Sequence, residues 1–472
     1  MSAVLQCDLC VIGAGAAGLS VAVGAAQLGA RTVLFERGSM GGDCLNYGCV
    51  PSKALLAAAH AAYTSSHSTH LGVSVASGPV DFAAVMRHVH AVIAQIAPHD
   101  SVERLEGLGV RVIRASAAFT GRDQLSGGGI TVRARRSVIA AGSAPVLAPI
   151  EGLEGLGALT NETLFALTER PEHLLILGGG PIGVEMAQAF VRLGSRVTLF
   201  ERAALLPRDT PEFAAMLRDQ LRSEGVTVRE HATVSALTRS GPSITVRCAD
   251  GGEVRGSHLL VAAGRAPRLA GLGLERAGVA YGPEGITVDD RLRTTNRRIY
   301  ALGDVLGRPQ FTHTAGYQAG IVIRNALFRL PARVDYRALP WVTYTDPELA
   351  HVGLTEAQAR ERFGPTIQVV RSDFAENDRA RAEGQTCGGI QVITDRRGRI
   401  LGVDLLGAHA GELIGLWALA ITRRLKLAAL TGVIFPYPTL GEISKASASA
   451  FFAPKLFSPG PRRLVRLLLR LP

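Results

Sequence analysis

The chain has 472 residues, 47% of them hydrophobic, with 54 glycines and a formal net charge of +11 at neutral pH. This length allows two or three domains around a large core, and six dispersed cysteines are too few for the disulfide framework of a small secreted protein. Nearly all of the positive charge is arginine scattered along the chain, a pattern that argues against a nucleic-acid partner.

The N-terminal stretch predicts a dinucleotide-binding βαβ unit. An apolar strand at Cys7–Ile12 is followed by a glycine-rich turn, an apolar helix to about Leu28 and a second strand at Arg31–Phe35. Glycines in such a turn let backbone amides approach a pyrophosphate at the helix N-terminus. Glu36 ends the second strand, where an acid binds ribose hydroxyls. The glycines of the turn are Gly13, Gly15 and Gly18.

Two cysteines in the first strand, Cys7 and Cys10, form a CxxC pattern. Strand positions three apart face opposite sides of a sheet. We therefore expect both cysteines to be core residues on opposite faces, without a redox role.

The stretch 41–53, GGDCLNYGCVPSK, holds Cys44 and Cys49 just ahead of an alanine-rich helix. The positive end of a helix dipole lowers the pKa of a thiol and makes the thiolate available. Lys53 follows Cys49 by one helical turn and shares its helix face. The alternative is a structural disulfide or a pair of buried thiols.

This stretch resembles the redox-active disulfide of the flavoprotein disulfide reductases, the group of dihydrolipoamide dehydrogenase, glutathione reductase and mercuric reductase. The resemblance runs over nearly the whole chain and implies FAD and NAD(P)H as cofactors. It also implies that Cys49 is the thiol against the flavin and that Cys44 is the interchange thiol that meets substrate. Lys53 is then the lysine near the flavin, paired with a glutamate of the second nucleotide-binding domain.

A second dinucleotide fingerprint follows the strand Leu174–Leu177 and precedes the strand Arg196–Phe200. Two dinucleotide sites in one chain suit hydride transfer from nicotinamide to flavin. Glu185, in the intervening helix, fits the family's partner of Lys53. Glu201 accepts hydrogen bonds from a free 2′-hydroxyl and repels a 2′-phosphate, so we expect NADH to be favoured. The glycines of this turn are Gly178, Gly180 and Gly183.

Three further segments resemble parts of the family's FAD site. The segment Arg136–Pro145 is expected to be a buried strand that ends at Gly142, and it resembles the link that passes the FAD into the next domain. The segment Leu259–Arg265, with Gly264, resembles the return crossing. Asp304, in IYALGDV, is expected to bind the ribityl chain.

From about Asp335 the composition changes, and Thr343–Arg360 resembles the start of the family's interface domain, read as a strand, a proline turn and a helix. In the family this domain makes a symmetric homodimer, and its last segment reaches into the partner's active site. The predicted fold class is α/β, with two Rossmann-like dinucleotide-binding domains and an α+β C-terminal dimerisation domain. The expected division is 1–150 (FAD, first part), 151–265 (NAD(P)), 266–334 (FAD, return part), 335–458 (dimerisation) and 459–472 (basic amphipathic tail).

The segment from Phe435 to Glu442 departs from the thiol-specific members of the family, which have a histidine at the position of Tyr437 and a glutamate where Glu442 stands. A phenol with a pKa near 10 trades protons with a thiol poorly at pH 7, whereas an imidazole does so well. Phe-Pro-Tyr is similar to mercuric reductase, but the last cysteine here is Cys387. We therefore expect this protein to lack the C-terminal cysteine pair and the N-terminal metal-binding domain of that enzyme, and we do not expect a mercuric reductase proper. No carboxylate or cysteine stands at ligand spacing from the histidines before residue 91, and we predict no metal site.

The tail contains arginines at three-to-four spacing with leucines between them, a pattern that predicts a basic amphipathic helix for an anionic membrane surface. Packing on its own dimer, or fraying, is the alternative. The sequence has no signal-peptide pattern and no apolar run of about 18 residues, so we expect a cytoplasmic protein, with a peripheral contact to the inner face of the membrane. These arginines are Arg462, Arg463, Arg466 and Arg470.

Together these features predict a homodimer that passes electrons from NAD(P)H through FAD to the Cys44–Cys49 disulfide and on to a small-molecule acceptor. The acceptor is a disulfide, a thiophilic metal ion or a quinone-like compound. Two alternatives stay open. One is a diaphorase or quinone reductase in which the cysteines only regulate, and the other is a membrane-associated redox sensor.

Overall fold

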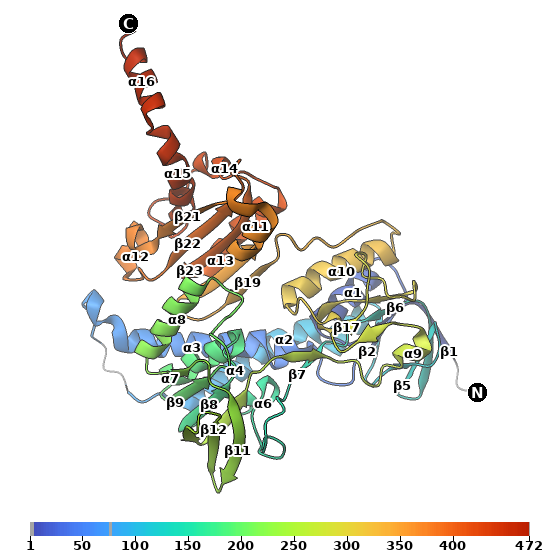
Figure 1. The fold of residues 1–472 in the computed structure, drawn as a ribbon. Helices are drawn as coiled ribbons and strands as arrows, with labels where there is room; N and C mark the ends of the chain where they lie inside the picture. The colour runs from blue at the N-terminus through green and yellow to red at the C-terminus, as the bar shows by residue number, and fades with distance from the viewer. Residues whose placement is uncertain (1–3, 75–77, 472) are drawn as a thin grey trace. The chain divides into compact units, whose positions relative to one another are not determined.

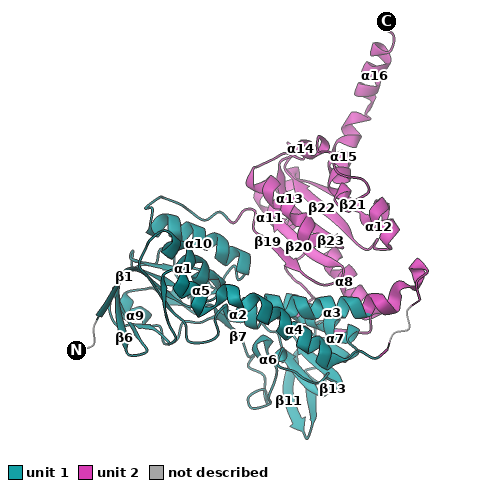
Figure 2. Ribbon diagram, turned by 180° about the vertical axis from the view of Figure 1, so that it is seen from behind, with its two compact units in different colours: residues 1–62, 79–202, 229–335 teal, residues 63–78, 203–228, 336–472 magenta. Residues whose placement is uncertain are grey.

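A computed structural model describes residues 4–74 and 78–471 (Figure 1). The chain forms two compact units (Figure 2). Unit 1 comprises residues 1–62, 79–202 and 229–335, and unit 2 comprises residues 63–78, 203–228 and 336–472. The architecture confirms the predicted α/β class, because unit 1 contains two sheets with parallel βαβ cores and unit 2 contains an antiparallel sheet with helices.

The first sheet of unit 1 has the strand order β3-β2-β1-β6-β5-β4, with β18 also beside β6. The strands β3, β2, β1, β6 and β18 run parallel, whereas β5 pairs antiparallel with β6. The end of β1 is buried on both faces, as expected for an apolar strand between two layers. The elements are β1 (Val4–Ile12), α1 (Ala16–Gln27), β2 (Thr32–Phe35), β3 (Val110–Ile113), β4 (Ala118–Phe119), β5 (Gln124–Gly127), β6 (Ile130–Ile139), β18 (Ile299–Ala301) and α10 (Thr312–Ala326).

The two cysteines of β1 are buried, but the expectation that they face opposite sides of the sheet is wrong. Cys7 and Cys10 belong to the same apolar cluster, and their side chains are hydrogen-bonded to each other. The amides of Asp8 and Leu9 both donate to the carbonyl of Arg31, at 2.9 and 3.2 Å. Because two successive amides share one acceptor, the strand is irregular here and the regular alternation of its side chains is broken.

The second sheet of unit 1 repeats the pattern of the first. Strand β8 lies between β9 and β14 and runs parallel to both, and a small antiparallel sheet, β11-β12-β13, belongs to the same region. The elements are β8 (His173–Leu177), α7 (Pro181–Arg192), β9 (Arg196–Phe200), β11 (Val234–Ser240), β12 (Ser243–Cys248), β13 (Glu253–Gly256) and β14 (His258–Val261).

The two segments that link these sheets pair with each other. The strand that the sequence predicts to end at Gly142 ends three residues earlier, since β6 stops at Ile139, and a separate short strand, β7 (Ser143–Pro145), follows. It pairs antiparallel with β15 (Arg265–Pro267). Gly142 and Gly264, at φ +72° and +129°, make the turns that enter these strands.

Unit 2 is built on an antiparallel sheet of strand order β19-β20-β23-β22-β21. Trp417 of α13 is fully buried in its core. We predicted a strand, a proline turn and a helix for residues 343–360. The structure has one more strand there: Pro347 lies between β19 and β20, and α11 follows β20. The elements are β19 (Pro340–Thr343), β20 (Glu348–Gly353), α11 (Glu356–Phe363), β21 (Gln368–Asp373), α12 (Asp378–Glu383), β22 (Gly389–Thr394), β23 (Ile400–Gly407), α13 (Ala410–Thr422), α14 (Ala428–Thr431), α15 (Glu442–Leu456) and α16 (Pro459–Leu468).

The shorter and connecting elements complete the chain. None of the helices in the described residues has the length and apolar character needed to cross a bilayer. These elements are α2 (Gly42–Asn46), α3 (Cys49–His67), α4 (Phe82–Ile96), α5 (Val102–Gly107), α6 (Asn161–Leu164), α8 (Pro211–Ser223), β10 (Thr227–Arg229), α9 (Leu274–Ala277), β16 (Tyr281–Gly282) and β17 (Gly285–Ile286).

Candidate active site

The two cysteines of the predicted redox pair lie on successive helices. Cys44 is in α2, and Cys49 is the first residue of α3. Both are thiols in the structure; Cys44 is half-buried and Cys49 is exposed. Cys49 Sγ lies 3.3 Å from the hydroxyl oxygen of Thr312, at the start of α10, and the Cys44 side chain is also hydrogen-bonded to Cys49.

The surroundings of the pair shift the pKa values of the two thiols in opposite directions. The hydrogen bond from Cys44, the hydrogen bond with Thr312 and the nearby charge of Lys53 lower the pKa of Cys49 to about 6. The same contact with Cys49, together with burial and the negative charge that forms on Cys49, raises the pKa of Cys44. At neutral pH the dithiol therefore holds one proton, on Cys44, and Cys49 is a thiolate.

Lys53 and Glu185, far apart in the sequence, form an ion pair. Lys53 Nζ of α3 lies 2.9 Å from Glu185 Oε2 of α7. The Glu185 side chain is only 6% exposed, whereas that of Lys53 is 37% exposed. The pair connects the helix that starts at Cys49 to the helix that starts at the second glycine turn.

The glycines of the first turn have two different roles. A Cβ on Gly13 would lie 2.4 Å from the carbonyl oxygen of Ala140, and a Cβ on Gly18 would lie 1.8 Å from the carbonyl oxygen of Gly13. These two glycines are needed for backbone packing. A Cβ on Gly15 would have no neighbour closer than 3.8 Å, the Cα of Gly42, so this position is open. The tight contact with α2 is at Gly42, where a Cβ would lie 2.6 Å from the Cα of Gly15.

The second glycine turn has the same geometry. A Cβ on Gly178 would lie 2.4 Å from the carbonyl oxygen of Ala262, and a Cβ on Gly183 would lie 1.8 Å from that of Gly178. Within the described residues, nothing lies within 4 Å of a Cβ built on Gly180. Each turn therefore leaves its middle glycine open, which is the position where a dinucleotide pyrophosphate approaches in this motif.

The two acids predicted to bind ribose hydroxyls lie at the ends of equivalent strands. Glu36 follows β2 and accepts a hydrogen bond from the Ala14 amide at 2.6 Å. Glu201 follows β9 and accepts one from the Gly179 amide at 2.6 Å. Each carboxylate thus faces its own glycine turn.

Asp304 lies next to the paired links between the sheets. Its carboxylate accepts a hydrogen bond from the Ser143 hydroxyl at 2.6 Å and lies 4.0 Å from the Arg265 guanidinium. Burial raises the pKa of Asp304. A Cβ built on Gly142 or Gly264, the residues that precede Ser143 and Arg265, would have no neighbour within 4 Å among the described residues, so the backbone at both glycines is open.

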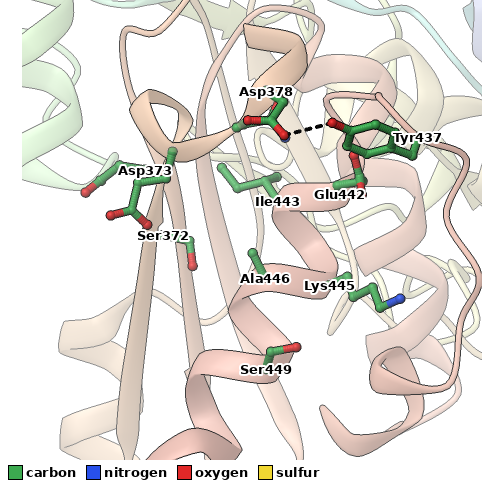
Figure 3. A pocket seen from close by; sticks show the side chains of 11 residues that line it. Ser372, Asp373, Asp378, Tyr437, Glu442, Ile443, Lys445, Ala446 and Ser449 are labelled. Carbon is green, nitrogen blue, oxygen red and sulfur yellow. Dashed lines mark hydrogen bonds between the residues drawn. The ribbon is translucent and has the colours of Figure 1, made fainter. Parts of the chain in front are cut away.

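Tyr437 and Glu442 lie in unit 2, where they line a cavity of about 320 Å³ (Figure 3). The Tyr437 hydroxyl donates a hydrogen bond to Asp378 Oδ2 at 3.0 Å. This bond and the negative charge of Asp378 raise the pKa of Tyr437 above the ordinary value of a phenol. Glu442 begins α15, and its carboxylate lies 3.4 Å from the amide of Thr439.

Several contacts of the site were missed by the sequence analysis. Thr312 lies 263 residues after Cys49, and nothing in the sequence pattern joins the two. Asp43 lies 3.0 Å from the Arg265 guanidinium and accepts a hydrogen bond from the Asn161 amide at 3.0 Å. Asp378 is an ordinary first residue of a short helix in the sequence, and only the fold brings it to Tyr437.

Comparison with known proteins identifies the family. Residues 7–319 match the family model described as pyridine nucleotide-disulphide oxidoreductase, and residues 339–448 match the dimerisation domain of the same family. The chain belongs to the pyridine nucleotide-disulphide oxidoreductase family. It is therefore an NAD(P)H-dependent flavoprotein disulfide oxidoreductase, and its dimerisation domain implies a homodimer.

Relatives match over nearly the full chain. The chain is 40% identical to a mercuric reductase of Streptomyces lividans over 455 residues, covering 94% of this chain and 96% of that protein. It is 33% identical to a dihydrolipoyl dehydrogenase of Geobacillus stearothermophilus over 460 residues, covering 94% and 96%. The structure of the HOCl-induced flavoprotein disulfide reductase RclA of Escherichia coli matches with a TM-score of 0.85 at 32% identity, covering 94% of this chain and 99% of that one.

Family membership implies FAD and NAD(P)H, and both glycine turns fit a dinucleotide. In each turn the first and last glycines pack against backbone carbonyl oxygens, and the middle glycine is open. A carboxylate at the end of the following strand accepts a hydrogen bond from an amide of the turn. Cys44 and Cys49 lie beside the first turn and fit the family's redox-active disulfide.

The hydrogen bond between Thr312 and Cys49 predicts a shift in thiol reactivity. Thr312→Val removes a hydroxyl that stabilises the thiolate, so the pKa of Cys49 rises by about one unit, the lower end of what a hydrogen bond to a charged group contributes. A raised pKa moves the onset of thiolate reactivity to higher pH. The midpoint is measured as the pH dependence of iodoacetamide alkylation of Cys49 in the reduced protein, followed by mass spectrometry.

The matched control is Thr314→Val, the same change two residues on. The Thr314 hydroxyl is buried and has no hydrogen-bond partner among the described residues. Its variant keeps the wild-type midpoint. A Thr312→Val midpoint equal to that of the control contradicts this assignment.

Proposed function

We propose that the protein passes electrons from NADH to the Cys44–Cys49 disulfide and from there to a small thiophilic acceptor. The observation that carries the proposal is the placement of the two cysteines on successive helices, with Cys49 Sγ 3.3 Å from the Thr312 hydroxyl oxygen. The direction of the pKa shifts, lowered at Cys49 and raised at Cys44, agrees with it. The Lys53–Glu185 ion pair beside them supports it, because a fixed cation one turn from Cys49 favours its thiolate.

The residues proposed to hold the cofactors follow the two halves of unit 1. FAD, when bound, supplies two-electron transfer between nicotinamide and disulfide. The proposed FAD residues are Gly13, Gly15, Gly18, Glu36, Lys53, Gly142 and Asp304. The proposed NAD(P)H residues are Gly178, Gly180, Gly183 and Glu201. Gly264, in the return crossing to the FAD part, is proposed as a further cofactor-binding residue.

The reduction of the pair balances without an added proton. A hydride from NADH carries two electrons and one proton, and breaking the Cys44–Cys49 bond with two electrons leaves two sulfur anions. One proton settles on Cys44, whose pKa is raised, and Cys49 remains a thiolate. The products are NAD⁺, one thiol and one thiolate, so charge and atoms are conserved.

The acceptor is proposed from the surroundings of Tyr437. In the family the equivalent histidine exchanges protons with the interchange thiol, whereas the Tyr437 hydroxyl already donates to Asp378 and its pKa is raised. This phenol therefore keeps its proton at neutral pH and makes a poor base for thiol–disulfide exchange. A thiophilic metal ion binds thiolates directly and is the favoured acceptor. The similarity to a mercuric reductase supports this choice.

The test compares acceptors in the wild-type flavoprotein and in Cys44→Ser. Steady-state NADH oxidation is measured with Hg²⁺ or Cu²⁺, with glutathione disulfide or lipoamide, and with menadione. We expect metal-dependent turnover that falls at least a hundredfold in Cys44→Ser, because the interchange thiol is lost. Cys387→Ser, a change at an exposed cysteine of unit 2, is the control and retains turnover.

Two other functions, a diaphorase and a redox sensor, predict different results in this test. Full turnover of menadione by Cys44→Ser, with no metal turnover by the wild type, indicates a diaphorase in which the cysteines regulate. Slow turnover with every acceptor, together with membrane binding that changes with the redox state, indicates a sensor. Either result contradicts the proposed electron path.

The preference for NADH is proposed from Glu201. A carboxylate at this position accepts hydrogen bonds from a 2′-hydroxyl and repels a 2′-phosphate. We expect a higher kcat/KM with NADH than with NADPH. Glu201→Ala lowers the ratio of kcat/KM for NADH to that for NADPH at least tenfold, because a hydrogen bond to a charged group contributes about 1.5–3 kcal/mol. The measurement is the ratio of kcat/KM values. Glu169→Ala, at an exposed position of unit 1, leaves the ratio unchanged; a ratio below one in the wild type contradicts the assignment.

The domain division and the cellular site are proposals of the same kind. The pairing of β7 with β15 supports a division in which residues 151–265 form the NAD(P) domain between two parts of the FAD domain, with dimerisation residues at 335–458 and a tail at 459–472. We place the protein in the cytoplasm, with its tail at the inner face of the membrane.

A further inference from the structure

The last helix of the chain, α16, has no buried residue. The preceding helix, α15, buries residues only as far as Phe451. In Figure 1, α16 extends away from the sheet of unit 2 and carries the C-terminus. A helix of ten residues is marginal in water without tertiary contacts. Burial of its apolar face is therefore the natural source of its stability.

The side chains of α16 and the residues after it fall into two separate faces. At 100° per residue, the three arginines of α16, Arg462, Arg463 and Arg466, lie within an arc of about 100°, and Arg470 follows in the turn after the helix. The remaining arc carries large apolar side chains whose exposed fractions run from 52% to 80%. The arginines are Arg462, Arg463, Arg466 and Arg470, and the apolar residues are Leu464, Val465, Leu467, Leu468, Leu469 and Leu471.

The charge of this end of the chain is of one sign. Glu442 is the last acidic residue, and the thirty residues after it contain two lysines, four arginines and no acid. A protein surface of mixed charge would meet this cationic face with both signs. The headgroups of an anionic bilayer meet all four arginines with the complementary charge, while the leucines enter the acyl boundary below them.

We propose that α16 is a docking helix for the surface of a bilayer rich in anionic phospholipid. The helix lies parallel to the membrane with its leucines down and its arginines among the headgroups.

The test is co-sedimentation of the full-length flavoprotein with vesicles. We expect binding to vesicles of about equal phosphatidylglycerol and phosphatidylcholine, and little binding to phosphatidylcholine alone. Arg463→Gln with Arg466→Gln weakens partition of each helix roughly 25-fold, because each basic residue near an anionic surface contributes about 1 kcal/mol, or about fivefold. Leu467→Gln weakens it through the apolar face.

The control is Arg396→Gln with Arg397→Gln, which removes the same charge from an exposed turn of unit 2. It keeps vesicle binding within about twofold, and all variants keep wild-type NADH oxidation. Equal binding by the tail variant and the control, or equal binding to neutral vesicles, overturns the proposal. A third result also overturns it: the wild type does not co-sediment with vesicles, and Leu467→Gln lowers the oligomeric mass measured by sedimentation equilibrium. In that case α16 packs on a second copy of the chain.

Discussion

The Lys53–Glu185 ion pair is the interaction on which the proposed site depends. Glu185 is almost completely buried, and a buried carboxylate without its cation costs several kcal/mol, so α3 is bound to α7 by more than packing. Cys49 is the first residue of α3, and Lys53 lies one turn after it. The same lysine that neutralises Glu185 therefore also lowers the pKa of Cys49. One ion pair thus connects the position of the redox pair to its electrostatics.

The glycine turns of the two nucleotide-binding parts of unit 1 have the same pattern of tightly packed and open positions. In each, the first and last glycines of the turn pack so closely against backbone carbonyls that a Cβ would clash, while the middle glycine remains open. The links between the parts pair as β7 and β15, and Ser143 of that pairing donates a hydrogen bond to Asp304. The crossing between the two parts therefore also holds Asp304, one of the proposed FAD residues.

Much of this was predictable from the sequence, because local patterns carry it. Apolar strands, glycine turns and terminal acids repeat at fixed spacing, and the cysteine stretch is specific enough to indicate its own chemistry. Contacts between distant segments were not predictable: Thr312 reaches Cys49, and Asp378 reaches Tyr437, only through the fold. The placement of Cys7 beside Cys10 was missed because a strand irregularity, invisible in the sequence, changes the direction of a side chain.

The central claim is that Cys44 and Cys49 form a disulfide that accepts the electrons of NADH. The most direct measurement is an anaerobic titration of the purified flavoprotein with NADH, in which flavin absorbance is recorded and samples are alkylated for mass spectrometry. The account predicts that the first equivalent of NADH makes both cysteines available to alkylation while the oxidised flavin absorbance is largely retained. Loss of flavin absorbance with the first equivalent, while Cys44 and Cys49 remain joined, would contradict it.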